Sequence, residues 1–268
     1  MDWAGGGRAS ARETVGRVMA GAVAFRVLKR LCPNLITSCY VQQVAGIVMK
    51  ESTPNVHEHK NIYATDNPMR CPESATAMEM QAVIEDAKKR RDSVGSIVVF
   101  AIKNLPVGLG DPVFDKLHAD IAKAILSLPA VKGIEFGSGF GCAELEGSKN
   151  NDVFVMDEAE VRTSTNHAGG ILGGISTGEV IYGRVAFKPP SSIGQEQSSI
   201  DTSGKQIKLD IGGRHDPCLG PRAVPIVECS IANVILDHVL RNYLVQSVRS
   251  DFSKENLTRR LNDSNTKR

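Results

Sequence analysis

The 268-residue sequence has little that marks it for a charged or lipid partner. Its net charge is only +2 at pH 7, and the basic residues are dispersed rather than clustered, which gives no electrostatic footprint for nucleic acid. No RNA-reading or zinc-finger signature is present. No apolar run approaches the roughly 20 residues that span a bilayer. The sequence therefore predicts neither a nucleic-acid partner nor a membrane span.

Cysteine usage excludes further classes of protein. The six cysteines lie far apart and form no C-x-x-C pair, so no zinc or other metal site is expected. No secretory segment precedes them, and reduced thiols in an intracellular protein are the expectation. The stretch "GIEFGSGFGCAE" resembles a dinucleotide-binding turn, but its glycines miss the G-x-G-x-x-G spacing, which argues against a Rossmann site.

Hydrophobic periodicity predicts alternating helices and strands over most of the chain. The predicted helices cover 10–31, 72–91, 109–128 and 224–245. The predicted strands lie within 33–48, 95–105, 131–140, 179–190 and 205–213. This alternation predicts a single α/β domain, a layered sheet–helix sandwich over residues 1–248. The polar segment 51–71 is expected as an exposed excursion, and 249–268 as a disordered polar tail.

The stretch "GGGRASAR" at 5–12 is the first candidate site. A glycine-rich loop that enters a helix N-terminus presents free N–H groups to an anion, and Arg8 and Arg12 add positive charge. Ser10 and Glu13 form the S-x-x-E pattern of a capping box. The alternative, which these residues leave open, is that Ser10 only caps the helix.

Three further stretches could carry chemistry, although each also has a plain structural explanation. "NHAGGILGGISTGE" at 166–179 could lie flat against a planar ligand or form ordinary turns. "FKPPSSIG" at 187–194 could bind a phosphate or only end a strand. "GGRHDPCLGPRAVP" at 212–225 places Arg214, His215 and Asp216 between residues that restrict the backbone. Asp216 could act as an acid–base group or simply pair with Arg214.

Together and in this order, these stretches resemble the conserved blocks of the chorismate synthase family. The resemblance rests on "GGGRASARET", "GSKNNDVF", "TNHAGGILGGISTGE", "VAFKPPSSI", "GRHDPCLGPRAVPIVE" and the long block from 92 to 133. It extends from about Gly5 to about Asn242. It implies a lyase of the shikimate pathway that converts 5-enolpyruvylshikimate 3-phosphate to chorismate and phosphate by 1,4-anti elimination. It also implies a requirement for reduced FMN, although the net reaction is redox-neutral.

The resemblance also implies roles for particular residues. It assigns catalysis to Asp216 and Ser10, and substrate contacts to Ser10, Arg12 and Arg214. Two positions depart from the family pattern, because Ala9 stands where serine is common and Pro190 where threonine is common. The residues implied to contact the flavin are Arg8, Ala9, Ser10, Ala130, Gly173, Lys188, Pro189, Pro190, Ser191, Ser192 and Arg214.

The family pattern includes a further N-terminal segment with a G-E-S-H-G block and a second histidine, which this sequence does not show. The chain is therefore expected to form the C-terminal two-thirds of the family fold, incomplete at the N-terminus and inactive by itself. A non-catalytic remnant that binds only flavin or a partner subunit is the alternative. The resemblance also implies a homotetramer. The cytoplasm is the expected location, with a plastid as the alternative if a transit segment is missing.

Overall fold

The computed structural model of the chain describes residues 10–50, 63, 66–158, 160–212 and 215–251. The described helices are the 3-10 helix η2 (Ala11–Thr14), α1 (Val15–Leu31), α2 (Ser74–Lys89), α3 (Leu117–Leu126), the 3-10 helix η3 (Gly139–Glu144), α4 (Gly147–Asn150) and α5 (Gly220–Asp251). The described strands are β1 (Ile36–Val44), β2 (Ile47–Val48), β3 (Ser96–Lys103), β4 (Val131–Phe136), β5 (Phe154–Asp157), β6 (Glu160–Thr163), β7 (Ile171–Leu172), β8 (Ile175–Ser176), β9 (Ile181–Phe187), β10 (Gln197–Ile200) and β11 (Gln206–Leu209).

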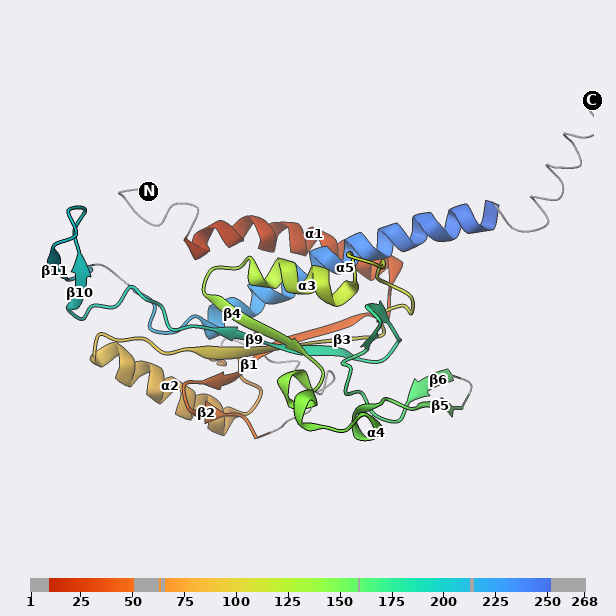
Figure 1. The fold of residues 1–268 in the computed structure, drawn as a ribbon, viewed down its shortest axis with the longest axis horizontal. Helices are drawn as coiled ribbons and strands as arrows, with labels where there is room; N and C mark the ends of the chain where they lie inside the picture. The colour runs from red at the N-terminus through yellow and green to blue at the C-terminus, as the bar shows by residue number, and fades with distance from the viewer. Residues whose placement is uncertain (1–9, 51–62, 64–65, 159, 213–214, 252–268) are drawn as a thin grey trace, which may run out of the picture.

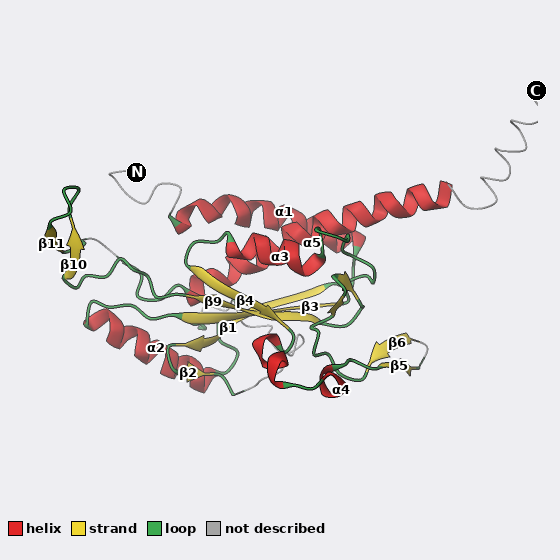
Figure 2. Ribbon diagram, in the orientation of Figure 1, coloured by secondary structure: helices red, strands yellow, loops and turns green. Residues whose placement is uncertain are grey.

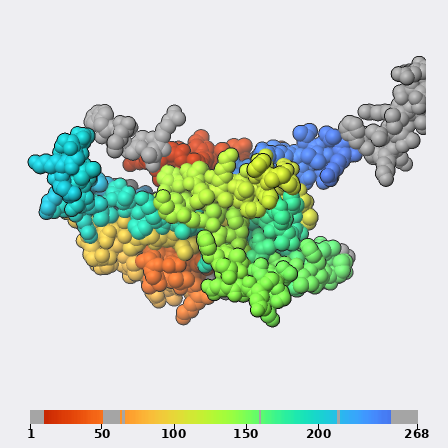
Figure 3. Space-filling model, viewed as in Figure 1, coloured from red at the N-terminus to blue at the C-terminus, as the bar shows by residue number. Residues whose placement is uncertain are grey.

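A five-stranded sheet with the order β2-β1-β3-β9-β4 forms the centre of the molecule. All of its ladders are antiparallel. Helices α1, α3 and α5 lie on one side of the sheet and α2 lies on the other (Figures 1 and 2). This arrangement confirms the predicted layered sheet–helix sandwich. Three two-stranded hairpins complete the described part of the chain, and two of them, β5–β6 and β10–β11, project from opposite ends (Figure 3).

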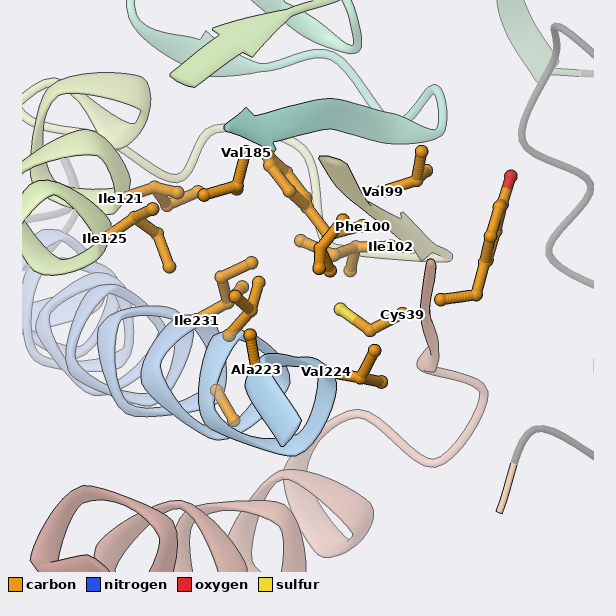
Figure 4. Close-up of a cluster of buried hydrophobic side chains, with 14 of the residues drawn as sticks. Cys39, Val99, Phe100, Ile102, Ile121, Ile125, Val185, Ala223, Val224 and Ile231 are labelled. Atoms are coloured by element: carbon orange, nitrogen blue, oxygen red, sulfur yellow. The ribbon is translucent and has the colours of Figure 1, made fainter. Parts of the chain in front are cut away.

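The main core fills the space between the sheet and the helices α3 and α5. Ile121 and Ile125 of α3 and Ile231 of α5 meet Phe100 and Val185 of the central strands (Figure 4). These residues are buried almost completely, because strand residues two apart share a face and helix residues four apart share a stripe. The apolar spacing read from the sequence therefore places the correct faces inward.

A close approach between strands explains one glycine of β9. A Cβ added at Gly183 would lie 2.2 Å from the carbonyl oxygen of Glu135 and 2.6 Å from the ring of Phe100. Neither neighbour can move without disturbing the sheet, since Gly183 pairs with both Phe100 and Phe136. Glycine at this position lets the Phe100 ring cross β9 and make an edge-on contact with the Phe136 ring, with centroids 5.7 Å apart.

The predicted helix over 109–128 is wrong for its first eight residues. Helix α3 begins only at Leu117, and Val113 and Phe114, which lie in the first part of the predicted helix, are 70% and 88% exposed. The Asp111 N–H bonds the Asp115 carbonyl at 2.8 Å, which closes a turn instead of continuing a helix. The Leu117 N–H donates to the carbonyl of Gly174 in the β7–β8 turn, and the helix can start at Leu117 because this N–H has a partner outside the helix.

Other predicted boundaries also shift. Residues 249–251, predicted as part of the tail, continue α5; no glycine or proline stop signal occurs after Pro225 to end the helix. The strand predicted within 205–213 exists as β11, but it pairs only with β10, outside the main sheet. Most of the predicted excursion, 51–62 and 64–65, lies outside the described residues, as does 252–268.

Helix α5 is long and apolar enough, by length and composition alone, to cross a membrane. Its most apolar 18-residue stretch, within 220–249, is 56% buried inside the protein, and α5 packs against α1, α3, β1 and β3. A core helix of a globular domain meets the same criterion, because it is apolar on most of its surface. The contacts of α5 are those of such a core helix.

Candidate functional site

A cavity of about 340 Å³ brings the start of the described chain together with the beginning of α5. It lies where α1 and α5 begin, at the same end of the sheet (Figure 1). Ser10 and Arg12 contribute from the start of the chain and Asp216 from the segment ahead of α5. The full lining is Ser10, Ala11, Arg12, Thr14, Leu128, Pro129, Phe187, Asp216, Leu219, Arg222, Ala223 and Ile226. The predicted catalytic residues therefore share one cavity.

Ser10 both caps the first helix and lines the cavity. Its Oγ accepts a hydrogen bond from the Arg12 N–H at 3.4 Å, and its carbonyl accepts one from the Glu13 N–H at 3.2 Å. The reciprocal half of the predicted capping box is wrong, because the Glu13 carboxylate pairs with Arg17 at 3.3 Å instead of returning to Ser10. Ser10 therefore caps the helix and lines the cavity at the same time.

Asp216 faces the cavity as one half of an ion pair. Its Oδ2 accepts a hydrogen bond from Arg222 at 2.6 Å, and their side chains are 32% and 60% exposed, respectively. Pairing with Arg214 was one of the two alternatives that the sequence left open for Asp216. Arg214 lies outside the described residues, and the described partner is Arg222, in the first turn of α5. Sequence reasoning missed Arg222, although it lies in the quoted block at 212–225. Its spacing from Asp216 does not indicate a contact unless the start of α5 at Gly220 is already known.

The predicted flavin loop at 188–192 joins the same region through the backbone. The Lys188 N–H donates to the carbonyl of Ala130 at 2.9 Å, and Phe187 and Pro129, their immediate neighbours, both line the cavity. Ala130 has φ +69°, a conformation that non-glycine residues rarely adopt. The structure therefore brings Ala130 and Lys188 together at the edge of the cavity.

Beyond this loop lies a second, smaller cavity of about 170 Å³ that shares Asp216 with the first. Ser192 lines it, and the Ser93 hydroxyl donates to the carbonyl of Pro190 at 2.6 Å. Pro189 and Ser191 are the remaining residues of the loop that runs from Lys188 to Ser192. Ser10, Arg12, Ala130, Asp216 and the 188–192 loop are thus grouped in one region.

Gly173 is separated from this group. It occupies the turn between β7 and β8, with φ +61°, ahead of β9, whereas Lys188 follows β9. The seven residues of β9 span roughly 20 Å, so Gly173 lies toward the opposite end of the sheet. Its neighbours Leu172 and Ile175 instead line another cavity, of about 740 Å³. Arg8, Ala9 and Arg214 lie outside the described residues.

A carboxylate fixes the shape of the glycine-rich segment that carries Gly173. Asp152 accepts hydrogen bonds from the backbone N–H groups of His167 and Ala168 at 2.7 and 2.8 Å, and from Thr165 Oγ1 at 2.7 Å. Burial acts to raise the pKa of Asp152, but these hydrogen bonds outweigh burial and hold the pKa below its ordinary value. Sequence reasoning missed Asp152, although it belongs to the quoted block "GSKNNDVF".

The described site joins a helix N-terminus, guanidinium groups, a carboxylate and a lysine-containing loop, which are groups suited to a polar, anionic ligand. The chorismate synthase family model matches residues 1–240. Chorismate synthase of Methylacidiphilum infernorum is 48% identical over 252 residues, 94% of this chain and 68% of that protein. Chorismate synthase of a Synechocystis strain is 49% identical over 241 residues, 90% of this chain and 66% of that protein.

A crystal structure of chorismate synthase matches the fold with a TM-score of 0.72 and 26% identity, over 87% of this chain and 65% of that one. The chain belongs to the chorismate synthase family, which confirms the resemblance drawn from the sequence blocks and the fold type that it implied. The chain spans about two thirds of the length of these relatives.

Proposed function

We propose that the protein functions as a chorismate synthase, converting 5-enolpyruvylshikimate 3-phosphate to chorismate and phosphate. The observation that carries the proposal is the cavity that joins Ser10 and Arg12 to Asp216. The substrate carries two carboxylates and a phosphate, and a site for it needs hydrogen-bond donors and fixed positive charge. The N-terminal end of the first helix and the guanidinium groups of Arg12 and Arg222 supply both at one cavity.

The elimination removes one proton and one phosphate from the substrate and leaves no net oxidation or reduction. Arg12 and Ser10 are suited to hold the anionic substrate at the helix N-terminus. Asp216 is the carboxylate suited to hold or move a proton, and its pair with Arg222 fixes the direction of the carboxylate group. In this assignment Arg222 is a positioning residue for Asp216.

The residues present also fit reduced FMN as the cofactor. One wall of the cavity is apolar, formed by Leu128, Pro129, Phe187 and Ile226, which suits a flat ring system. Lys188, Ser191 and Ser192 follow directly and would hold the phosphate of the flavin. The bound reduced flavin supplies an electron-rich group to a reaction with no net redox change.

A homotetramer, in the cytoplasm or in a plastid, is part of the same proposal. Val15, Met19 and Val23 are 62%, 66% and 64% exposed, and their spacing of four places them along one stripe of α1. The projecting β5–β6 hairpin also exposes Met156 and Val161. Apolar surface of this kind supports association with further copies of the chain.

The test is an anaerobic assay of the 268-residue chain with reduced FMN and substrate, following chorismate and phosphate together. The same assay is run on the chain fused behind the N-terminal third of a relative. We expect reduced FMN to bind in both cases and both products to appear in equal amounts with the fused protein. Flavin binding without turnover in either protein would favour the non-catalytic alternative. Absence of both binding and turnover would refute the proposal.

A further inference from the structure

The start of β3 lies against the segment that carries Asp216 into α5. Cys218 is 7% exposed and belongs to the main hydrophobic core. Ser96, the first residue of β3, is 5% exposed and faces Cys218. We propose that Cys218 and Ser96 are positioning residues for Asp216, because they fix the segment 216–220 and with it the direction of the Asp216 carboxylate. This inference rests on the proposed function, in which Asp216 holds or moves a proton.

Three donors surround the Cys218 sulfur: the N–H groups of Gly220 and Leu219 and the hydroxyl of Ser96. Helix α5 begins at Gly220, so both N–H groups belong to the helix end, where no carbonyl inside the helix can accept them. The sulfur atom takes the place of the oxygen that usually caps a helix at its N-terminus. Cys218 therefore ties the start of α5 to β3.

The Ser96 hydroxyl is buried beside this thiol and beside the first residue of α5. In the described part of the chain it makes no hydrogen bond to a nitrogen or oxygen atom. A buried hydroxyl without a partner costs free energy, so the contact with the thiol keeps Ser96 directed at Cys218. A Cβ added at Gly220 would lie 2.8 Å from both Cβ and Oγ of Ser96. Glycine therefore lets the helix begin this close to the strand.

The thiol of Cys218 is suited to this structural contact rather than to nucleophilic chemistry. Burial raises the pKa of Cys218, although the three donors act in the opposite direction. A reactive cysteine at a helix N-terminus has a lowered pKa and is partly open to solvent, and Cys218 shows neither property. The thiol stays protonated and neutral near pH 7, so its contribution to the site is made through the backbone that it holds.

Two further bonds connect this anchor to the Asp216 carboxylate. The carbonyl of Pro217, directly after Asp216, accepts the Val94 N–H at 2.8 Å, and the ring of Pro217 restricts the backbone φ. The carboxylate itself accepts a hydrogen bond from Arg222, in the first turn of α5, at 2.6 Å. Asp216 and its partner are thus both attached to the segment that lies against β3.

The same end of β3 also locates the apolar wall of the cavity. Ser96 pairs with Phe187 in the ladder between β3 and β9, and Phe187 lines the cavity together with Asp216. A Cβ added at Gly95 would lie 2.9 Å from the Phe187 carbonyl oxygen, so the two strands approach closely at this point. Gly95 and Ser96 therefore set the position of the carboxylate relative to the apolar wall.

The first test is kinetic and uses a catalytically active preparation, which is the fused protein described above if the chain alone is inactive. Cys218→Ala should lower kcat by about tenfold and leave KM and FMN affinity within about twofold, because a misdirected carboxylate slows the reaction without removing a binding group. Cys218→Ser should restore kcat to within about threefold, because its hydroxyl accepts the same N–H groups. Ser96→Ala is the milder variant and should lower kcat by about threefold.

Cys229→Ala is the matched control. Cys229 lies in the same helix, is 8% exposed and is not part of the cavity lining, so its replacement should lower Tm and leave kcat unchanged. In an Asp216→Asn background, Cys218→Ala should lower kcat no further, because the carboxylate through which it acts is already absent. An unchanged kcat in both Cys218→Ala and Ser96→Ala, or an equal further loss in the Asp216→Asn background, would overturn the proposal.

Thermal unfolding of the 268-residue chain tests the same coupling without any turnover. Cys218→Ala and Arg222→Ala should each lower Tm, and the double variant should lower it by less than the sum, because both act on the segment 216–220. Cys229→Ala combined with Arg222→Ala should give the sum. If no preparation turns over the substrate, the proposed function fails and this measurement decides alone. A loss in Cys218→Ala/Arg222→Ala equal to the sum would then reject the positioning role.

Discussion

Arg17 of α1 donates a hydrogen bond to Ser127 Oγ at 2.6 Å, across the 110 residues that separate them in the chain. The same guanidinium meets the Ala124 carbonyl at 3.4 Å and the Glu13 carboxylate at 3.3 Å. It therefore joins two parts of the lining of the 340 Å³ cavity, the first turn at Ser10–Thr14 and the loop at 128–130 that follows α3.

Replacing Arg17 with alanine should destabilise the protein by about 1–2 kcal/mol, since one charged hydrogen bond to a partly exposed group is lost. It should also weaken FMN binding, because the loop at 128–130 is no longer held against α1. Urea unfolding and flavin titration measure the two effects. Arg26→Ala, at an exposed position on the same helix, is the control and should change neither. Unaltered flavin affinity in Arg17→Ala would remove Arg17 from the site.

Asp216 and Arg222 should respond differently to substitution. Asp216→Asn keeps the shape of the side chain, so flavin and substrate should still bind, while turnover should fall by about 10²- to 10⁴-fold. Arg222→Ala should lower turnover less, because it leaves the carboxylate in place but removes its direction. Steady-state kinetics of a catalytically active preparation distinguish the two through kcat and KM. A wild-type rate in Asp216→Asn would exclude Asp216 from proton handling.

Lys188→Ala should weaken binding of reduced FMN by about 10- to 150-fold, the equivalent of one charge-assisted hydrogen bond. The backbone bond from the Lys188 N–H to Ala130 survives the substitution, so Tm should change little. Anaerobic titration monitored by flavin absorbance measures the affinity. Lys132→Ala, on the neighbouring strand β4, serves as the control for loss of a surface lysine. A flavin affinity equal to that of the wild type would contradict the assigned phosphate contact.

Asp152 should make stability depend on pH at the acidic end. Its pKa in the folded protein lies below the ordinary value of 3.8, so the unfolded chain binds this proton more readily. The stabilisation is fully present above the unfolded pKa and is lost as pH falls through the folded pKa.

Asp152→Asn should reduce this dependence. It should also cost about 1–3 kcal/mol at neutral pH, because an amide NH₂ would face a backbone N–H. Denaturant unfolding between pH 7 and pH 3 checks both effects, with the exposed Asp157→Asn as the control. A parallel pH profile for Asp152→Asn and wild type would show that Asp152 does not stabilise the glycine-rich segment electrostatically.

Local patterns in the sequence predicted most of the elements. Apolar spacing placed Ile121 and Ile125 on a buried helix face, and β-branched runs marked the strands around Val98 and Val185, all of which are confirmed. The failures occurred where a distant segment decides the outcome. Helix α3 starts at Leu117 because its N–H bonds Gly174, and no residue near Leu117 carries that information.

The sequence by itself determined the family, the order of helices and strands, and the residue types available for binding anions. These depend on short-range spacing and on the order of the blocks along the chain. Only the tertiary structure decided which of those residues meet. It placed Ser10 and Asp216 at one cavity, gave Asp216 the partner Arg222, set Arg91 beside Ser192, and separated Gly173 from Lys188 by the length of β9. The physical reason is that such contacts depend on how strands and helices pack across the sheet, and sequence separation does not specify that distance.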